Sequence, residues 1–114
     1  MEDLNSLAQA WLDAWNAHDL EAILSHYADD IVFYSPFIKK INNDPSGCIR
    51  GKEALRTYFS RALTAYPELH FELYHIMEGV NSVVLHYKSI NNLLSAETMI
   101  VKDGKVVEVR AHYK

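Results

Sequence analysis

The spacing of apolar residues changes near residue 67, and this change limits the chain to few fold classes. Before it, apolar side chains recur every three or four positions, which is the period of an amphipathic helix. After it, apolar and polar residues alternate in short runs separated by turn residues, as in strands with one buried face. Helices followed by a strand meander are typical of an α+β domain, in which helices cover one face of a sheet.

Three helices are predicted before the change of period. The first runs roughly from Glu2 to Ala17, and the second follows Asp19, a residue type that caps helix starts, and includes Tyr27. The third begins after Gly51 and ends where Pro67 interrupts the helical spacing. Because each helix carries its apolar residues along one stripe, we expect that stripe to pack in the core.

Five strands are predicted beside these helices. The first is the apolar and aromatic run from Ile31 to Phe37, and a polar loop follows over residues 41–48. The other four form a meander over residues 69–78, 82–90, 93–102 and 105–113. Their turn sequences, such as Asn91-Asn92 and Asp103-Gly104, favour tight turns, so the sheet is expected to be mostly antiparallel.

Alternation within the last two strands predicts which side chains point inward. On the last strand these are Val107, Val109, Ala111 and Tyr113. On the strand before it they are Leu93, Ser95, Glu97, Met99 and Val101. Glu97 is a carboxylate in an otherwise largely apolar row, so it is the most informative residue for function.

Composition narrows the range of partners. A chain of 114 residues is expected to form one domain, spanning residues 1–114. Its 11 basic and 15 acidic residues give a net charge of -4, which argues against nucleic acid or an anionic membrane as a partner. Cys48 is the single cysteine, so no disulfide closes within the chain, and no long apolar segment is present; we therefore expect a cytoplasmic protein.

Three sequence motifs occur in a fixed order: W-N-A-H-D-L-E-A-I-L-S-H-Y-A-D-D-I-V-F, G-K-E-A-L-R-T-Y-F and D-G-K-V-V-E-V-R-A, with a proline just after the first predicted strand. In these motifs the chain resembles, over essentially its whole length, the SnoaL-like branch of the nuclear transport factor two superfamily. The resemblance implies a cone-shaped fold, also called a cystatin-like roll, in which a curved, mixed but mostly antiparallel sheet wraps around the helices. It also implies an apolar cavity and a homodimer.

The superfamily includes ketosteroid isomerase, and comparison with that enzyme implies a changed chemistry here. Ser35 stands just before the proline, where the isomerase has its catalytic aspartate base. Trp11 and Phe59 stand at the positions of its two tyrosines. Of the groups with which the isomerase stabilises the oxyanion formed in its reaction, only the second, a carboxylic acid, is matched here, by Glu97. A carboxyl kept neutral by apolar surroundings donates a hydrogen bond.

Three residues are candidates for proton transfer: Glu97, His75 and Ser35. Burial raises the pKa of a carboxyl, so an inward Glu97 is suited to act as an acid, a base or a ligand-orienting acceptor. His75 alternates with Phe71, Leu73 and Met77, so we expect it to face the same cavity, either as a partner of Glu97 or as a hydrogen-bonded core histidine. Ser35 is expected to assist. In the alternative interpretation, Glu97 accepts a hydrogen bond from a nearby protein donor or lies at the solvent-exposed opening of the cone.

The expected walls of a ligand site are Trp11, Trp15, Phe33, Phe37, Phe59, Tyr87, Met99 and Tyr113. One hypothesis is a pocket for a small apolar organic molecule, with isomerisation, hydration or hydrolysis, or cyclisation by acid/base chemistry. The other is that these side chains fill the core, and that the domain is a non-catalytic dimerisation or protein-interaction module. We expect no cofactor and no metal, since His70 and Glu72 are the nearest approach to a ligand pair.

Overall fold

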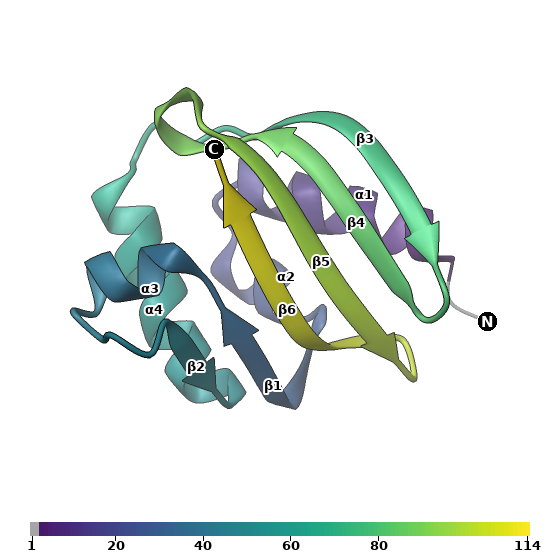
Figure 1. Cartoon of the computed structure of the whole chain (residues 1–114), viewed down its shortest axis with the longest axis horizontal. Coiled ribbons are helices and arrows are strands. Elements are labelled where there is room, and N and C mark those ends of the chain that lie inside the picture. Colours follow the sequence, from purple (N-terminus) through teal and green to yellow (C-terminus); the bar gives the residue numbers. More distant parts are fainter. Residues whose placement is uncertain (1–2) are drawn as a thin grey trace.

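The computed structural model describes residues 3–114, and helices precede most of the sheet along the chain (Figure 1). The helices are α1 (Leu4–Asn16), α2 (Leu20–Leu24), α3 (Pro36–Ile41) and α4 (Lys52–Ala65). The strands are β1 (Tyr27–Tyr34), β2 (Cys48–Arg50), β3 (Glu72–Gly79), β4 (Ser82–Lys88), β5 (Leu94–Lys102) and β6 (Lys105–Tyr113). A single 3-10 turn, Ile90–Asn92, connects β4 to β5.

The strands form one curved sheet in the order β2-β1-β6-β5-β4-β3 (Figure 1). Only the β1 and β6 pair is parallel, and the other neighbours are antiparallel. At one end of the sheet α1 packs against β3 and β4, and at the other end α4 packs against β1 and β2. This arrangement confirms the predicted α+β class and its mixed, mostly antiparallel sheet. No helix among residues 3–114 has the length and apolar character needed to span a membrane.

Two aspartates start the first two helices. Asp3 accepts a hydrogen bond from the backbone N–H of Asn5, so α1 begins at Leu4, and the predicted start at Glu2 lies outside the described residues. Asp19 accepts from the N–H of Ala22 at 3.1 Å, which confirms it as the cap of α2. The short α2 ends at Leu24, so the prediction that this helix includes Tyr27 is wrong.

The first strand differs from its prediction at both ends. β1 begins at Tyr27, because that residue pairs with Val106 on β6, and it ends at Tyr34. The chain then turns, since the Ser35 hydroxyl accepts from the N–H of Phe37 at 3.2 Å and Pro36 starts α3. Phe37 is therefore helical, and α3 is a short helix that the apolar pattern did not reveal.

Two β-bulges change which side chains face the helices. On β3 the pairing shifts between Leu73 and His75, so Tyr74 is the extra residue and every later side chain changes sides. On β6 the pairing with β5 shifts so that Val106 lies opposite Val101. Val106 is fully buried whereas Val107 is half-buried, so the prediction of Val107 as an inward residue is wrong.

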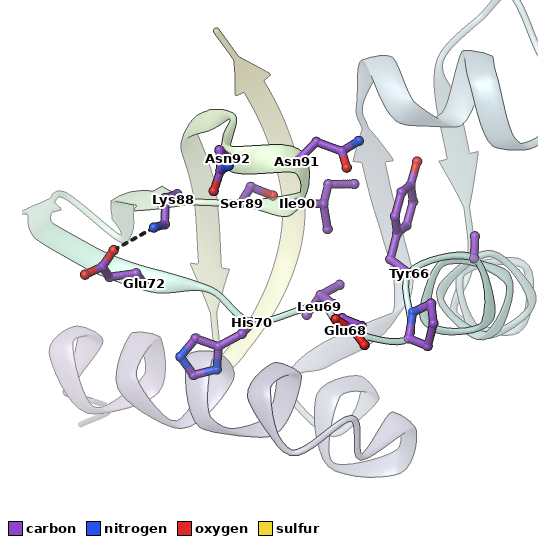
Figure 2. A pocket seen from close by; sticks show the side chains of 12 residues that line it. Tyr66, Glu68, Leu69, His70, Glu72, Lys88, Ser89, Ile90, Asn91 and Asn92 are labelled. Carbon is purple, nitrogen blue, oxygen red and sulfur yellow. Dashed lines mark ion pairs between the residues drawn. The ribbon is translucent and has the colours of Figure 1, made fainter.

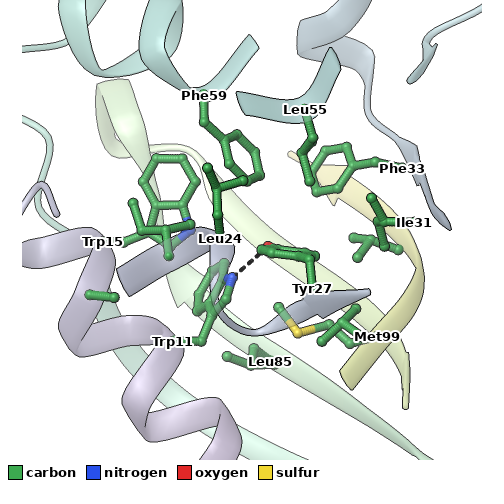
Figure 3. Packing of buried hydrophobic residues seen from close by; sticks show 14 of the residues in the cluster. Trp11, Trp15, Leu24, Tyr27, Ile31, Phe33, Leu55, Phe59, Leu85 and Met99 are labelled. Atoms are coloured by element: carbon green, nitrogen blue, oxygen red, sulfur yellow. Dashed lines mark hydrogen bonds between the residues drawn. The ribbon is translucent and has the colours of Figure 1, made fainter. Parts of the chain in front are cut away.

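Aromatic side chains dominate the core between sheet and helices (Figure 3). The Trp11 indole N–H donates to the Tyr27 hydroxyl at 2.8 Å, and both side chains are buried. Trp15 packs edge-on against Phe59, with ring centroids 4.8 Å apart. Met99 lies in the same cluster with no exposed surface.

Candidate functional site

Glu97 occupies the middle of β5 and points toward the helices. Its cross-strand neighbours are Leu85 on β4 and Ala111 on β6, both buried. The side chain of Glu97 is only 3% exposed, although carboxylates are rarely buried to this extent without a partner. Ser95, Met99 and Val101 on the same side of the strand are also buried, as the alternation predicts.

One phenol is the hydrogen-bond partner of this carboxyl. The Tyr87 hydroxyl donates to Oε1 of Glu97 at 2.6 Å, and Tyr87 is also fully buried. The second oxygen, Oε2, has no hydrogen-bond partner within residues 3–114. No ion pair of the described residues includes Glu97. Half of the carboxyl is therefore available to another molecule.

Burial shifts the acidity of Glu97 into the neutral range. Removal from water disfavours the charged form and raises the pKa of Glu97 from 4.5 to about 7, although the hydrogen bond from Tyr87 lowers it in part. A carboxyl with this pKa is present in both protonation states near neutral pH. It therefore has the acidity of an effective general acid or base.

Hydroxyl groups from three other elements surround the same space. Burial raises the pKa of Tyr58, Tyr87 and Tyr113 well above the usual value of a phenol, and the nearby charge of Glu97 raises it further. These phenols therefore stay protonated at neutral pH. The buried Ser35 hydroxyl interacts with Tyr58 and Tyr113, which partly lowers their pKa values.

A small cavity of about 50 Å³ lies beside Glu97. Nine residues that the sequence predicts for the site line this cavity: Trp11, Trp15, Phe33, Ser35, Phe37, Phe59, Tyr87, Glu97 and Tyr113. The structure adds Ile41, Tyr58, Ala62, Tyr66, Leu69, Phe71, Ser89 and Ile90. Of these, Tyr58 could have been found from its place on the apolar stripe of the third helix. Met99 is not in the lining because it packs deeper in the core.

A wider open groove of about 660 Å³ lies outside the cavity (Figure 2). It runs between the segment after α4 and the turn Ile90–Asn92, and an ion pair of 3.3 Å between Lys88 and Glu72, on adjacent strands, lies at one end of it. Four residues line both spaces: Tyr66, Leu69, Ser89 and Ile90. The groove thus adjoins the cavity, and these four residues lie between the two spaces.

The prediction that His75 faces the cavity is wrong. The bulge at Tyr74 turns His75 to the outer side of the sheet, where it is exposed and stacks on His86 with ring centroids 5.7 Å apart. His112 is exposed as well, so none of these three histidines lines the cavity. Among residues 3–114 no group of three or more His, Cys, Asp or Glu side chains is placed to hold a metal ion.

Besides Oε2 of Glu97, two fully buried polar atoms lack a hydrogen-bond partner in the described part of the chain: Nε1 of Trp15 and Oγ of Ser95. The Trp15 N–H partly lowers the pKa of the Tyr27 hydroxyl, so the two groups lie close together, but they do not reach hydrogen-bonding geometry. Ser95 stands beside Tyr87 and Tyr113 on the neighbouring strands. The cavity region therefore has unused hydrogen-bonding capacity, which is uncommon in a fully packed core.

Replacing Tyr87 with Phe is expected to raise the pKa of Glu97 above 7. The phenol donates to the charged form of the carboxyl, and without that donor the charged form is less favourable. The pKa can be followed by NMR titration of the carboxyl carbons. Tyr74→Phe, on the exposed side of β3, is the matched control and should leave the titration unchanged. A constant or lower pKa in Tyr87→Phe would contradict this account of the site.

Comparison with known proteins gives a family and a fold. A model of the SnoaL-like domain family matches residues 8–112. A crystal structure of a SnoaL-like protein of unknown function from Burkholderia thailandensis is 45% identical, with a TM-score of 0.92 over 96% of this chain and 92% of that chain. A comparison with curated proteins finds no significant match.

Two more distant structures share the fold. A proposed polyketide cyclase from Sinorhizobium meliloti is 16% identical, with a TM-score of 0.79 over 96% of each chain. A protein with a ketosteroid isomerase-like fold from Catenulispora acidiphila, solved in complex with trimethylamine, is 13% identical. Its TM-score is 0.77 over 95% of this chain and 85% of that chain.

Proposed function

The chain belongs to the SnoaL-like domain family, and we propose that it binds a small, largely apolar organic molecule beside Glu97 and exchanges a proton with it. The observation that carries the proposal is a buried carboxyl with a pKa of about 7 and one unpaired oxygen at the wall of an aromatic cavity. Buried titratable groups with strongly shifted pKa values cluster at functional sites.

The roles of the polar groups follow from their chemistry. In its ionised form Glu97 accepts a proton from the ligand, and in its protonated form it donates one, as isomerisation, hydration or hydrolysis, and cyclisation all require. Ser35 has no base beside it, because its neighbours in the cavity are the phenols of Tyr58 and Tyr113. We therefore assign Ser35 to hydrogen bonding and orientation of the ligand instead of proton transfer.

The volume of the cavity limits the ligand. About 50 Å³ is far below the roughly 300 to 1,000 Å³ of usual ligand pockets, so it accepts only a few non-hydrogen atoms. A larger ligand extends past Leu69 and Ile90 into the outer groove. The polar residues of that groove then meet the part of the ligand that remains in water.

The same small volume supports a second candidate function. If the side chains fill the cone and Tyr87 alone satisfies Glu97, the domain acts as a dimerisation or protein-interaction module. The exposed apolar side chains of Tyr74, Met77 and Ile100 on the sheet would then form the contact. The homodimer expected from the resemblance stays a prediction.

Intrinsic fluorescence separates the two functions, because both tryptophans of the chain, Trp11 and Trp15, line the cavity. Titration with terpenoids, phenols, steroids and small acyl acids is expected to give saturable quenching with one class, and weaker binding of that class to Glu97→Gln. Glu78→Gln, an exposed change of the same kind on β3, is the control. The absence of saturable quenching with every class, and with a small organic cation added to the same panel, would replace the pocket by the interaction module.

A further inference from the structure

The lining of the cavity has an acidic side chain, Glu97, and no basic side chain among residues 3–114 to balance its charge. Among the described residues that line the cavity, Glu97 is the sole Asp, Glu, Lys, Arg or His side chain. It forms no ion pair, and its one hydrogen-bond donor is the neutral phenol of Tyr87. An ionised carboxylate at this depth has no positive charge to balance it, and an unbalanced buried charge is costly.

The walls of the cavity favour a positive charge in the same place. Ten of its seventeen lining residues are aromatic, so most surfaces a ligand meets are ring faces or ring edges. Trp11 and Tyr87 pack edge to face with ring centroids 5.6 Å apart, and Phe37 and Tyr113 do so at 4.6 Å. The faces of aromatic rings attract cations, and aromatic cages are a common recognition site for methylated ammonium groups.

From these observations we infer that the cavity binds a small organic cation, a methylated amine or ammonium group, whose charge is balanced by Glu97 and whose methyl groups contact the aromatic walls. The inference rests on the proposed function, because it names the ligand of the same site. The volume of about 50 Å³ agrees with a cationic group of a few non-hydrogen atoms. A longer substituent on the nitrogen would leave through the outer groove.

The protonation state of Glu97 determines how the affinity of the cavity for a cation changes with pH. The titratable groups facing Glu97 are Tyr87 from β4, Tyr113 from β6, Tyr27 from β1 and Tyr58 from α4. Burial keeps all four phenols neutral near pH 7, so Glu97 is the one group of this set that titrates there. A cation binds the ionised carboxylate, and its affinity therefore rises with pH up to about 7 and then levels off. A neutral ligand that accepts a hydrogen bond from protonated Glu97 shows the opposite trend.

The test compares two probes of similar size and different charge. Tetramethylammonium carries a permanent charge, so its own ionisation does not change with pH, and tert-butanol is a neutral counterpart. Binding of each is measured by tryptophan fluorescence and by calorimetry, at about pH 5 and about pH 8. The proteins are the wild type, Glu97→Gln and, as the matched control, Glu78→Gln.

We expect the wild type to bind tetramethylammonium about tenfold to 100-fold more tightly at the higher pH, following the ionised fraction of Glu97. Glu97→Gln is expected to lose about tenfold or more of this affinity at the higher pH and to lose the pH dependence. Glu78→Gln should match the wild type. Circular dichroism spectra identical to that of the wild type would show that the variants are folded.

Three results overturn the inference and are distinct from failure of the pocket itself. If tert-butanol binds as tightly as tetramethylammonium, or if affinity falls as the pH rises, the ligand is neutral and the pocket remains. If neither probe binds while a neutral class quenches the tryptophans, the cationic ligand is rejected and the proposed pocket again remains. If no compound of either experiment binds, the proposed function fails together with this inference.

Discussion

Raising the pH from 4.5 to about 7 is expected to lower the free energy of unfolding of the wild type by about 3 kcal/mol relative to the Glu97→Gln variant. Folded Glu97 keeps its proton until about pH 7, whereas the unfolded chain releases it near 4.5. Between these values the folded state binds more protons, so stability decreases as the pH rises. Above about pH 7 both states are ionised at this group, and its contribution no longer changes.

Denaturant unfolding of both proteins across this pH range measures the effect. Glutamine cannot ionise and has nearly the shape of glutamate, so the difference between the two curves isolates the titration of one group. Glu78→Gln is the control, since its side chain is exposed and its unfolding curve should follow that of the wild type. Parallel curves for the wild type and Glu97→Gln would show that Glu97 is ionised in the fold well below pH 7.

The expected loss of stability has a bearing on function. A leucine or methionine in place of Glu97 would remove this pH-dependent cost, because neither side chain ionises, and the neighbours Leu85 and Ala111 are themselves apolar. Groups that lower stability without helping the core are typical of binding and catalytic sites. The position of Glu97 therefore supports the proposed pocket over a core that is only filled.

Replacing Trp11 with Ala is expected to lower the free energy of unfolding by about 3 to 5 kcal/mol, the range for deleting a large aromatic side chain from a core. Trp11 is 1% exposed and stacks on Phe71 with ring centroids 5.8 Å apart. Its removal leaves a void and also takes the hydrogen-bond donor from the buried Tyr27 hydroxyl. The same denaturant experiment measures the loss.

Trp11→Phe is the matched variant, because it keeps an aromatic ring at the site and removes the indole N–H. We expect it to lose less stability than Trp11→Ala, because the phenyl ring still fills most of the space, and the loss that remains includes the missing hydrogen bond to Tyr27. A loss below about 1 kcal/mol in Trp11→Ala would mean that the centre of the cone is loosely packed.

Much of the site follows from local patterns in the sequence. Alternation along residues 93–102 predicts that Glu97 points inward beside Ser95, and both are buried. Helical spacing places Trp11 and Trp15 on one stripe, and both line the cavity. These predictions succeed because a side chain's direction within an uninterrupted strand or helix depends only on its own position in the repeat.

The remaining features depend on contacts between segments far apart in the chain. His75 and Val107 do not point to the side predicted for them. His75 follows the bulge in β3 and Val107 is the extra residue of the bulge in β6, and both bulges are set by pairing with the adjacent strand. Tyr27 joins β1 because Val106 on the last strand pairs with it.

Amino-acid sequence by itself thus determined the α+β class, the helical stripes and the inward direction of Glu97, since each arises from a short-range repeat. Tertiary structure alone decided the bulges, the placement of His75 on the outer face, the hydrogen bond from Tyr87 to Glu97 and the cavity volume. The physical reason is that register, burial and packing are properties of paired surfaces. They arise only when strands and helices from different parts of the chain meet.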